Sequence, residues 1–439
     1  MTGTGRPSDR HATTINILPD NVLLESFDFC LRRAHDSPLS YTLEWHKLVH
    51  VCRRWRQIIF ASPRRLDLQL LCTHGTPVRK NLGYWPASFP IVIDYHVYWN
   101  PESGRSFLPN DEDNVMAALE HPDRIRCLKL TLPSSLLAKV SSVMREPFPT
   151  LTLLRLSSED VDVLTLPSTF LGRYAPSLQE IYLEGIPFPT LPTLLLSASD
   201  LVNLQLHNIP NNGYISPEAM VTGLAALTRL ETLSIRFQTS FFCSNRTPPL
   251  VRIILPSLTV FGFRGNSEYL EALVARIDAP RLAFSRITYF NQLIFQVPQL
   301  SRFISRAENL GLAPFRHAQV GMRGSNVYIN FVCGQGAPFK SYLFLQVSCQ
   351  GLDWQVSSMA QILSQSSALL ANVAHLSIHA QRLRPGWKND VDHADWLDLL
   401  RAFAVVETLL VSRQLAAHVA LAFQGVTAMM AAEVLTALL

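Results

Sequence analysis

The chain has 439 residues, of which 48% are apolar and only 16% are charged, which is enough apolar material for a large buried core. This composition excludes an intrinsically disordered chain, which needs few apolar residues and a strong net charge. The net charge is +4, and the whole excess of positive residues lies in residues 1–66. The neutral remainder argues against a nucleic-acid-binding body, which would carry a concentrated basic face.

Residues 1–14 are polar and are expected to form a disordered leader without the apolar run of a secretory signal peptide. The seven cysteines are widely spaced and form no C-x-x-C pair, so neither a disulfide framework nor a zinc module is expected. Dispersed thiols suit an intracellular protein of the cytoplasm or nucleus. The charge-free run 414–432 approaches the length of a membrane span, but polar residues interrupt it and a buried helix explains it equally well. No membrane partner is therefore expected.

Residues 15–62 are expected to form a compact helical module. Pro19 suits the first turn of a helix, and an apolar stripe at helical spacing follows it as far as Leu31. Turn-forming residues at 35–38 interrupt this helix. A second apolar stripe steps by three and four residues and predicts one amphipathic helix; it consists of Trp45, Leu48, Cys52, Trp55 and Ile59.

The two ends of this module resemble the F-box family. The opening is Leu18-Pro19-x-x-Val22-Leu23-Leu24-x-x-Phe27, and the close is Leu48-x-x-Val51-Cys52-Arg53-Arg54-Trp55-Arg56-x-Ile58. The resemblance implies short helices that bind the Skp-type adaptor of an SCF ubiquitin ligase and, through it, the cullin. It assigns adaptor binding to Leu18, Pro19, Leu23, Phe27, Leu48, Val51, Cys52, Trp55 and Ile58.

A module of this size cannot bury all of its apolar surface, and an exposed apolar face commonly marks a binding site. The alternative is that most of these residues pack the core of the module itself. Arg53, Arg54 and Arg56 could form a nucleic-acid patch. However, three arginines are too few for phosphate-driven affinity, and a solvated helix edge explains them.

A Leu-x-x-Leu-x-Leu frame recurs through the middle of the chain, with intervals of 23 to 29 residues between its central positions. These intervals resemble those of leucine-rich repeats, although the asparagine ladder of that family is absent. Each frame predicts a short strand, and stacked strands with helical or proline-rich connections would form a solenoid with one continuous core. The central positions are Leu128, Leu154, Ile181, Leu204, Leu233, Phe261 and Ser285.

The predicted fold class is α/β, with a short N-terminal helical F-box module followed by an irregular leucine-rich-repeat-like solenoid of short strands and helices. Residues 63–124 are expected to be a linker leading into the repeats, 125–290 the solenoid, and 291–439 its degenerate continuation. In this last region we expect strands at 326–332 and 341–349, and the frame again near Leu376 and Leu409. The chain would end in an apolar helix at 431–439, either buried against a neighbour or belonging to a shortened gene product.

Residues that alternate with the buried leucines would line the concave face of a solenoid, where repeat proteins usually bind. The alternative is that they are ordinary solvated strand positions. The candidate target-binding residues are Lys129, Arg155, Tyr182, Glu184, Asn203, Gln205, His207, Ser234, Arg236 and Arg264.

The sequence contains no G-x-S-x-G, G-x-G-x-x-G or H-E-x-x-H motif and no Walker loop. His375 and His379 have the spacing of helical zinc ligands, but a predicted strand between them favours two ordinary histidines. Asp390, Asp392 and Asp395 around His393 are better explained by a helix cap than by a metal loop. No catalytic residue, metal or cofactor is therefore expected.

The predicted function is that of a non-catalytic substrate-recognition subunit of an SCF-type ubiquitin ligase, which tethers an unidentified target protein to the adaptor and cullin. The alternative is a leucine-rich-repeat-like interaction scaffold unrelated to ubiquitin ligation. Nucleic acid is not an expected partner in either case.

Overall fold

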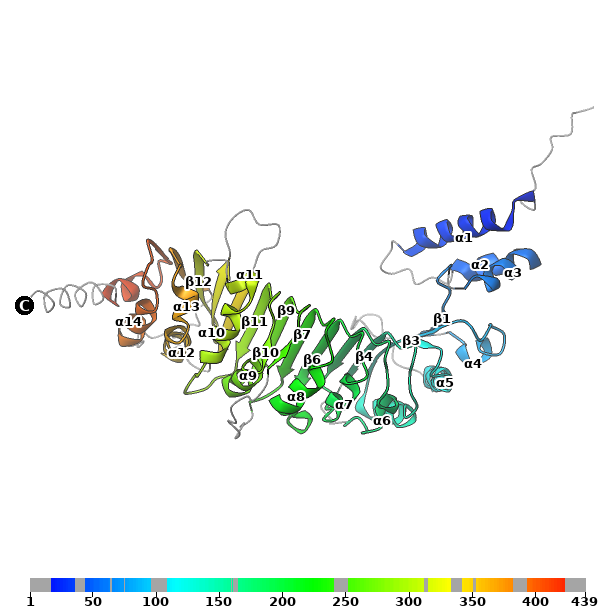
Figure 1. Ribbon diagram of the computed structural model, residues 1–439, viewed down its shortest axis with the longest axis horizontal. Coiled ribbons are helices and arrows are strands. Elements are labelled where there is room, and N and C mark those ends of the chain that lie inside the picture. Colours follow the sequence, from blue (N-terminus) through cyan, green and yellow to red (C-terminus); the bar gives the residue numbers. More distant parts are fainter. Residues whose placement is uncertain are drawn as a thin grey trace, which may run out of the picture. The chain divides into compact units, whose positions relative to one another are not determined.

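The computed structural model describes residues 17–35, 44–63, 65–74, 76–95, 109–158, 160, 165–240, 252–311, 315–332, 342–349, 353–381 and 393–422 (Figure 1). The chain forms two compact units. The first contains Met1–Asp94 and Arg105–Arg126, and the second contains Tyr95–Gly104 and Cys127–Leu439.

The first unit begins with the helices α1 (Asp20–His35), α2 (Glu44–Val49) and α3 (Arg53–Ala61). The single amphipathic helix predicted over Trp45 to Ile59 is therefore wrong, because the chain leaves the helical conformation between α2 and α3. Cys52 is extended there, with φ −155° and ψ 171°, and its side chain caps the start of α3. The unit continues with β1 (Leu70–Cys72), α4 (Val78–Asn81), β2 (Ile91–Tyr95) and α5 (Pro109–Leu119), and β1 pairs with β2 in parallel.

The core of the first unit extends beyond the predicted helical module. Buried side chains of α1, α2 and α3 form one cluster with Leu66, Leu68 and Phe89, and Trp85 packs against it. Residues 63–124, expected as a linker, thus contain two strands and two helices, and part of this segment completes the core of the helices. Sharing a core in this way gives a short helical module the burial that it cannot reach alone.

The second unit contains a row of parallel strands, one for each leucine frame. The predicted strands are confirmed, and consecutive frames align in register: Leu154 pairs with Ile181, and Ile181 with Leu204. The strands are β3 (Ile125–Leu132), β4 (Leu153–Ser158), β5 (Glu180–Glu184), β6 (Asn203–Ile209), β7 (Thr232–Phe237), β9 (Val260–Gly265) and β11 (Phe284–Tyr289). A separate short pair is formed by β8 (Ile253–Ile254) and β10 (Ile277–Asp278).

Helices and short turns connect these strands and lie along one side of them (Figure 1). The connection between β6 and β7 contains the helix α8, which Ser216 caps by accepting the backbone N–H of Ala219 at 3.2 Å. The frame leucines are buried between strands and connections, and Leu204 and Leu233 have no exposed surface. The connecting helices are α6 (Ser134–Val143), α7 (Leu191–Leu195), α8 (Pro217–Leu224), α9 (Ser267–Val274) and α10 (Pro298–Ser305).

After α10 the strand order departs from the chain order. The helix α11 (Glu308–Gly311) leads to the strands β12 (His317–Arg323), β13 (Asn326–Val332) and β14 (Tyr342–Ser348). Of these, β13 pairs antiparallel with both β12 and β14. β14 pairs with β11, and β12 pairs with a later strand, β15 (His375–Gln381). Gly324, at φ +57°, allows the tight turn that reverses the chain between β12 and β13.

The remaining described elements are α12 (Asp353–Ser364), α13 (Ser367–Leu370), α14 (His393–Arg401) and β16 (Thr408–Val411), and β16 pairs with β15 in parallel. The protein is therefore mixed α/β with a large, mostly parallel sheet. Residues 291–370, where the leucine frame disappears, hold the antiparallel meander β12–β13–β14. In the part of the chain that the structure describes, no helix is long and apolar enough to cross a membrane. The apolar run 414–432 lies only partly within the described residues, and the helix expected at 431–439 lies outside them.

Candidate functional site

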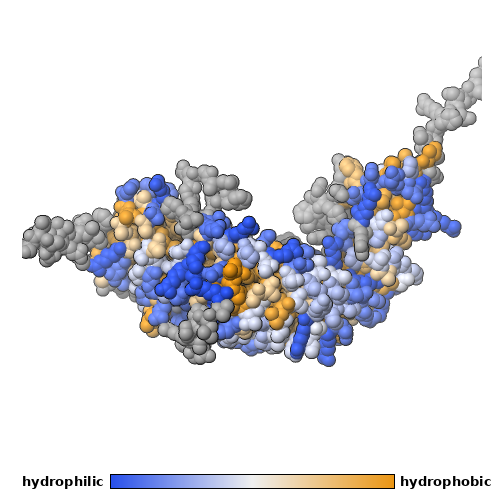
Figure 2. Space-filling view, in the orientation of Figure 1, coloured by the Kyte–Doolittle hydropathy of each residue, from blue (hydrophilic) through white to orange (hydrophobic). Residues whose placement is uncertain are grey.

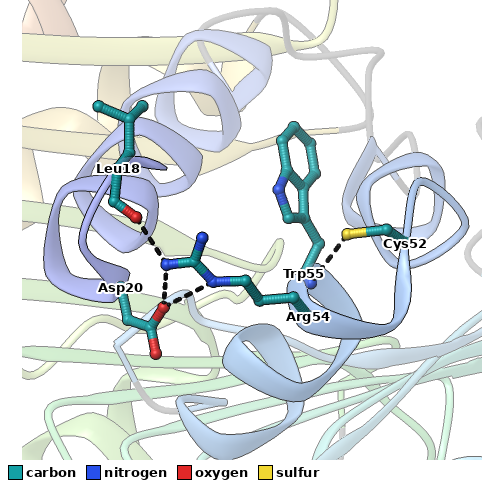
Figure 3. A network of polar contacts seen from close by, with 5 residues as sticks. All are labelled: Leu18, Asp20, Cys52, Arg54 and Trp55. Atoms are coloured by element: carbon teal, nitrogen blue, oxygen red, sulfur yellow. Dashed lines mark hydrogen bonds and ion pairs between the residues drawn. The ribbon is translucent and has the colours of Figure 1, made fainter. Parts of the chain in front are cut away.

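The start of α1 and the start of α3 are joined by Arg54 (Figure 3). Its Nη2 donates to the backbone oxygen of Leu18 at 2.6 Å and to Oδ1 of Asp20 at 2.6 Å, and its Nε donates to the same Oδ1 at 3.0 Å. Asp20 lies in the first turn of α1, where a negative side chain is also favoured by the helix dipole. Arg54 therefore fixes the Leu-Pro opening of the module relative to α3.

The neighbours of Arg54 have separate roles in the same motif. Cys52 caps α3, because its Sγ accepts the backbone N–H of Trp55 at 3.5 Å (Figure 3). The ring of Trp55 packs against Phe27 of α1, with 4.7 Å between ring centroids. Arg56 donates from Nε to the backbone oxygen of Val49 at 3.0 Å. Arg54 and Arg56 thus bind within the module, although Arg56 is also exposed at the helix edge, as expected.

The residues assigned to adaptor binding by resemblance fall into three groups. Leu23, Phe27 and Ile58 are buried in the core, where they support the helices. Leu48, Cys52 and Trp55 are half-buried. Only Leu18, Pro19 and Val51 are exposed, and the side chain of Val51 is 59% exposed. Direct contact with a partner would therefore fall mainly to these last three.

Further apolar side chains are exposed on the same unit. Ile17 is 71% exposed and Val22, in the first turn of α1, is 37% exposed. Figure 2 shows hydrophobic residues gathered at the surface over α1. We call Ile17, Leu18, Val22 and Val51 the apolar face of the module. The sequence places Val22 and Leu23 in one apolar stripe, and the spacing of three and four residues does not show which of them is covered.

The candidate target-binding residues share one face of the sheet in the second unit. Side chains alternate between the two faces of a strand, so the positions between frame leucines point away from the leucine core. Register places them in rows: Arg155 pairs with Tyr182 and Tyr182 with Gln205. Glu180 pairs with Asn203, Glu184 with His207, and Arg236 with Arg264. Lys129 pairs with Arg155, and Gln205 with Ser234.

These residues are not equally accessible. Arg264 is exposed, and most of the others are half-buried. Ser234 is an exception, because only 6% of it is exposed and its Oγ lies 3.2 Å from Nε2 of His207. Ser234 therefore supports His207 rather than facing a partner directly.

Glu184 is the centre of a polar network on this face. Its Oε2 accepts the hydroxyl of Tyr182 at 2.7 Å, and its Oε1 accepts the side-chain amide of Asn208 at 3.0 Å. Asn208 has φ +51° and lies where the register between β6 and β7 shifts. Burial and the hydrogen bond to Glu184 together raise the pKa of Tyr182 to about 12, against the opposing effect of Arg155. Tyr182 therefore remains a neutral hydrogen-bond donor at physiological pH.

His207 is held neutral beside this network. Burial and the positive charge of Arg236 together lower its pKa to about 4, against the opposing effect of Glu184. Its ring meets that of Tyr182 edge to face, with 5.1 Å between centroids, and the guanidinium of Arg155 lies 4.9 Å from the centre of the Tyr182 ring. At neutral pH, Tyr182 and His207 are therefore both uncharged.

A hollow of about 460 Å³ opens next to this network. It contains Arg236 and Arg264, which were predicted, and Arg286, which was missed. Arg286 occupies the alternating position of the weakest frame, between Ser285 and Ile287, so the same rule applied there would have found it. Asn326 and Gln346 also line the hollow. They come from the meander, and the leucine frames do not predict that its strand β14 pairs with β11.

The two histidines with zinc-like spacing lie on one strand, β15, as predicted. Each has its own neighbour: the ring of His375 stacks on that of His317 with 4.6 Å between centroids, and Nε2 of His379 lies 2.8 Å from the Tyr328 hydroxyl. Asp390 and Asp392 lie outside the described residues, as does the side chain of His393. Among the residues described, no group of three or more histidines, cysteines or carboxylates is arranged to hold a metal ion.

The two candidate surfaces are thus an apolar face on the helical module and a polar sheet face with an arginine-lined hollow. Comparison with known proteins adds no relative to either surface: no protein-family model matches the chain, and no curated protein sequence matches it.

Proposed function

We propose that the protein is a substrate-recognition subunit of an SCF-type ubiquitin ligase. The observation that carries the proposal is the apolar face of Ile17, Leu18, Val22 and Val51, which remains exposed beside the motif that resembles an F-box. An apolar helical face of this kind is suited to a groove on a partner. The Skp-type adaptor is the partner that the resemblance implies.

The local geometry gives the motif residues roles that fit this proposal. Arg54 holds Leu18 and Asp20 at the start of α1, and Cys52 caps α3. Both contacts fix the exposed residues in place before a partner binds, and such preorganisation reduces the entropy lost on association.

The second unit would bind the target protein through its polar sheet face, in a leucine-rich-repeat-like solenoid. The mechanism is tethering: a bound target is kept near the ubiquitin-loaded enzyme, which raises the effective concentration of its lysines. In this proposal the chain contributes binding surfaces and no catalytic group.

Co-purification of the full chain with a purified Skp-type adaptor tests the proposal. We expect wild type to bind, and Val51→Asp and Leu18→Asp to weaken binding by about tenfold or more, because a charge would enter an apolar contact. Val143→Asp is the matched control, since Val143 is 44% exposed on α6 of the other unit. If wild type does not bind the adaptor, or if Val51→Asp and Val143→Asp bind equally well, the proposal is wrong.

A second candidate function is a repeat-based interaction scaffold outside ubiquitin ligation. The observation that favours it is the shared core, in which α1, α2 and α3 pack against Leu66, Leu68 and Phe89. The helices would then serve as a cap for the segment that follows them. The same co-purification separates the two candidates, because a cap needs no adaptor.

A further inference from the structure

The arginine-lined hollow lies between strands that are distant in the sequence. Its lining comes from β5, β6, β7, β9 and β11 on one side and from the meander strands β13 and β14 on the other. β11 is the link, since it pairs with β9 and with β14. Besides Glu184, His207, Asn208 and Ser348, its polar lining consists of Arg236, Arg264, Arg286, Thr288, Asn326 and Gln346.

Of the three arginines, Arg236 interacts with the charge of Glu184, which raises its pKa. Among the described residues, none of Arg236, Arg264 and Arg286 forms an ion pair with a carboxylate. Two of them rest on aromatic rings instead: the guanidinium carbon of Arg264 lies 5.5 Å from the centre of the Phe290 ring, and that of Arg286 lies 5.1 Å from the centre of the Phe344 ring. Stacking holds the plane of a guanidinium while leaving the N–H groups at its edge available for a ligand.

The arginines also crowd one another. Burial lowers the pKa of Arg236, and the positive charges of Arg286 and Arg264 lower it further. Like charges held together in a partly buried place favour the binding of an anion, which would relieve their repulsion.

The charge of the hollow defines the ligand. Glu184 is the one carboxylate among its lining residues, and it already accepts hydrogen bonds from Tyr182 and Asn208. His207 is neutral at pH 7, so three arginines against one glutamate give the lining a net charge of +2. Arginine forks fit the oxygens of a phosphate in a bidentate way, and a phosphate monoester is close to a dianion at this pH.

We propose that this hollow binds a phosphate monoester carried by a side chain of the target protein. The inference rests on the proposed function in so far as the phosphorylated segment belongs to the recognised target. A peptide is favoured over nucleic acid because the positive charge is confined to one hollow, whereas binding driven by a nucleic-acid backbone draws on many separate phosphate contacts.

Calorimetric titration of the full chain at low ionic strength tests the inference directly. The probes are the blocked tripeptide Ala-phosphoserine-Ala, the same peptide with serine, and the same peptide with glutamate. We expect binding of the phosphoserine peptide alone, and a dissociation constant about tenfold higher for Arg264→Gln and for Arg286→Gln, because each substitution removes a charge-assisted hydrogen bond.

Two further variants make the titration specific. Arg281→Gln removes the same charge from an exposed position outside the hollow and is expected to bind like wild type. Arg264→Lys keeps the charge but loses the fork, so its affinity should fall between those of wild type and Arg264→Gln. Arg264 is exposed, so its replacement leaves the core intact.

Three results would overturn the inference: equal binding of the serine and phosphoserine peptides, equal binding of the glutamate peptide, or an equal loss in Arg281→Gln. Displacement of the phosphopeptide by an oligothymidylate at a comparable concentration would assign the hollow to nucleic acid instead. Adaptor co-purification of the same variants keeps the two proposals separate. Failure of peptide binding with intact adaptor binding rejects the phosphate site alone, and the reverse result rejects the ubiquitin ligase role alone.

Discussion

The helical module and the sheet separate their buried and exposed residues in different ways. Along β6, buried Leu204 and Leu206 flank the accessible Gln205, so the core and the binding surface alternate residue by residue. Along α1, exposed Val22 stands next to buried Leu23 within one apolar stripe. A period of two therefore assigns faces directly, whereas an apolar stripe on a short helix can serve both the core and a partner.

The two units also differ in whether the polar contacts between their helices are exposed or buried. Arg54 joins α1 to α3 through Asp20, whose side chain is 67% exposed. Glu271 of α9 instead accepts the backbone N–H groups of Gln299 at 2.7 Å and Leu300 at 2.8 Å, which start α10, in a largely buried place. The first link orients a surface, and the second connects neighbouring layers of the sheet unit.

The largest effect is expected for Phe27→Ala, which removes a ring from the shared core of the first unit. We expect a loss of about 3–5 kcal/mol in the free energy of unfolding of this unit. Amide hydrogen exchange should rise both in α1–α3 and in residues 66–89. Phe29→Ala is the control, since Phe29 is 61% exposed. Faster exchange in α1 alone would show that the core is not shared.

Leu233→Ala makes the corresponding change in the core of the second unit. Leu233 pairs with Leu204 and Phe261, and a cavity at its position should cost about 3 kcal/mol. Because stacked units contact mainly their neighbours, exchange should rise in β6, β7 and β9 and stay unchanged in α1–α3. An equal rise in both units would contradict the independence of their cores.

Glu271→Gln should change how the stability of the second unit depends on pH. Burial raises the pKa of Glu271 to about 7 from its ordinary value of 4.5, so between these pH values the folded state binds more protons than the unfolded state. Stability should therefore fall as the pH rises through this window, by about 3 kcal/mol, and this fall should be absent in Glu271→Gln.

His207 has the opposite influence on stability. Its pKa is lowered from 6.5 to about 4 in the folded protein, so its contribution to the free energy of unfolding rises as the pH rises between these values. The difference between wild type and Glu271→Gln, measured by urea unfolding at each pH, cancels the contribution of His207. If the difference in free energy of unfolding between wild type and Glu271→Gln does not vary with pH, the folded protein does not raise the pKa of Glu271.

The smallest effect is expected for Arg54→Ala. Ion pairs near the surface contribute little, so we expect a loss of about 1 kcal/mol or less. The start of α1 should nevertheless exchange faster, while the fluorescence of the tryptophans in the core stays unchanged. Arg53→Ala, at an exposed position of the same helix, is the control. A loss as large as that of Phe27→Ala would mean that the polar link, and not the core, holds the module together.

The sequence was sufficient to predict the strands and their alignment, because each frame repeats the same buried leucines. It could not predict the break at Cys52, since a spacing of three and four residues favours one helix and a thiol is an unusual cap. The shared core with Phe89 and the place of Gln346 in the hollow depend on contacts between distant segments. No local pattern encodes such contacts.

The position of β14 beside β11 also has a consequence for synthesis on the ribosome. In the large sheet, β4, β5, β6, β7, β9 and β11 can each pair with a strand made before it, so this part of the sheet can grow as the chain emerges. β11 must then wait for Tyr342–Ser348, while β12 and β13 can pair with each other but still lack their outer neighbours β15 and β14. An open strand edge is a site for aggregation and for chaperone binding. The interval between Phe290 and Tyr342 is therefore the stage at which slow translation would be most costly to correct folding.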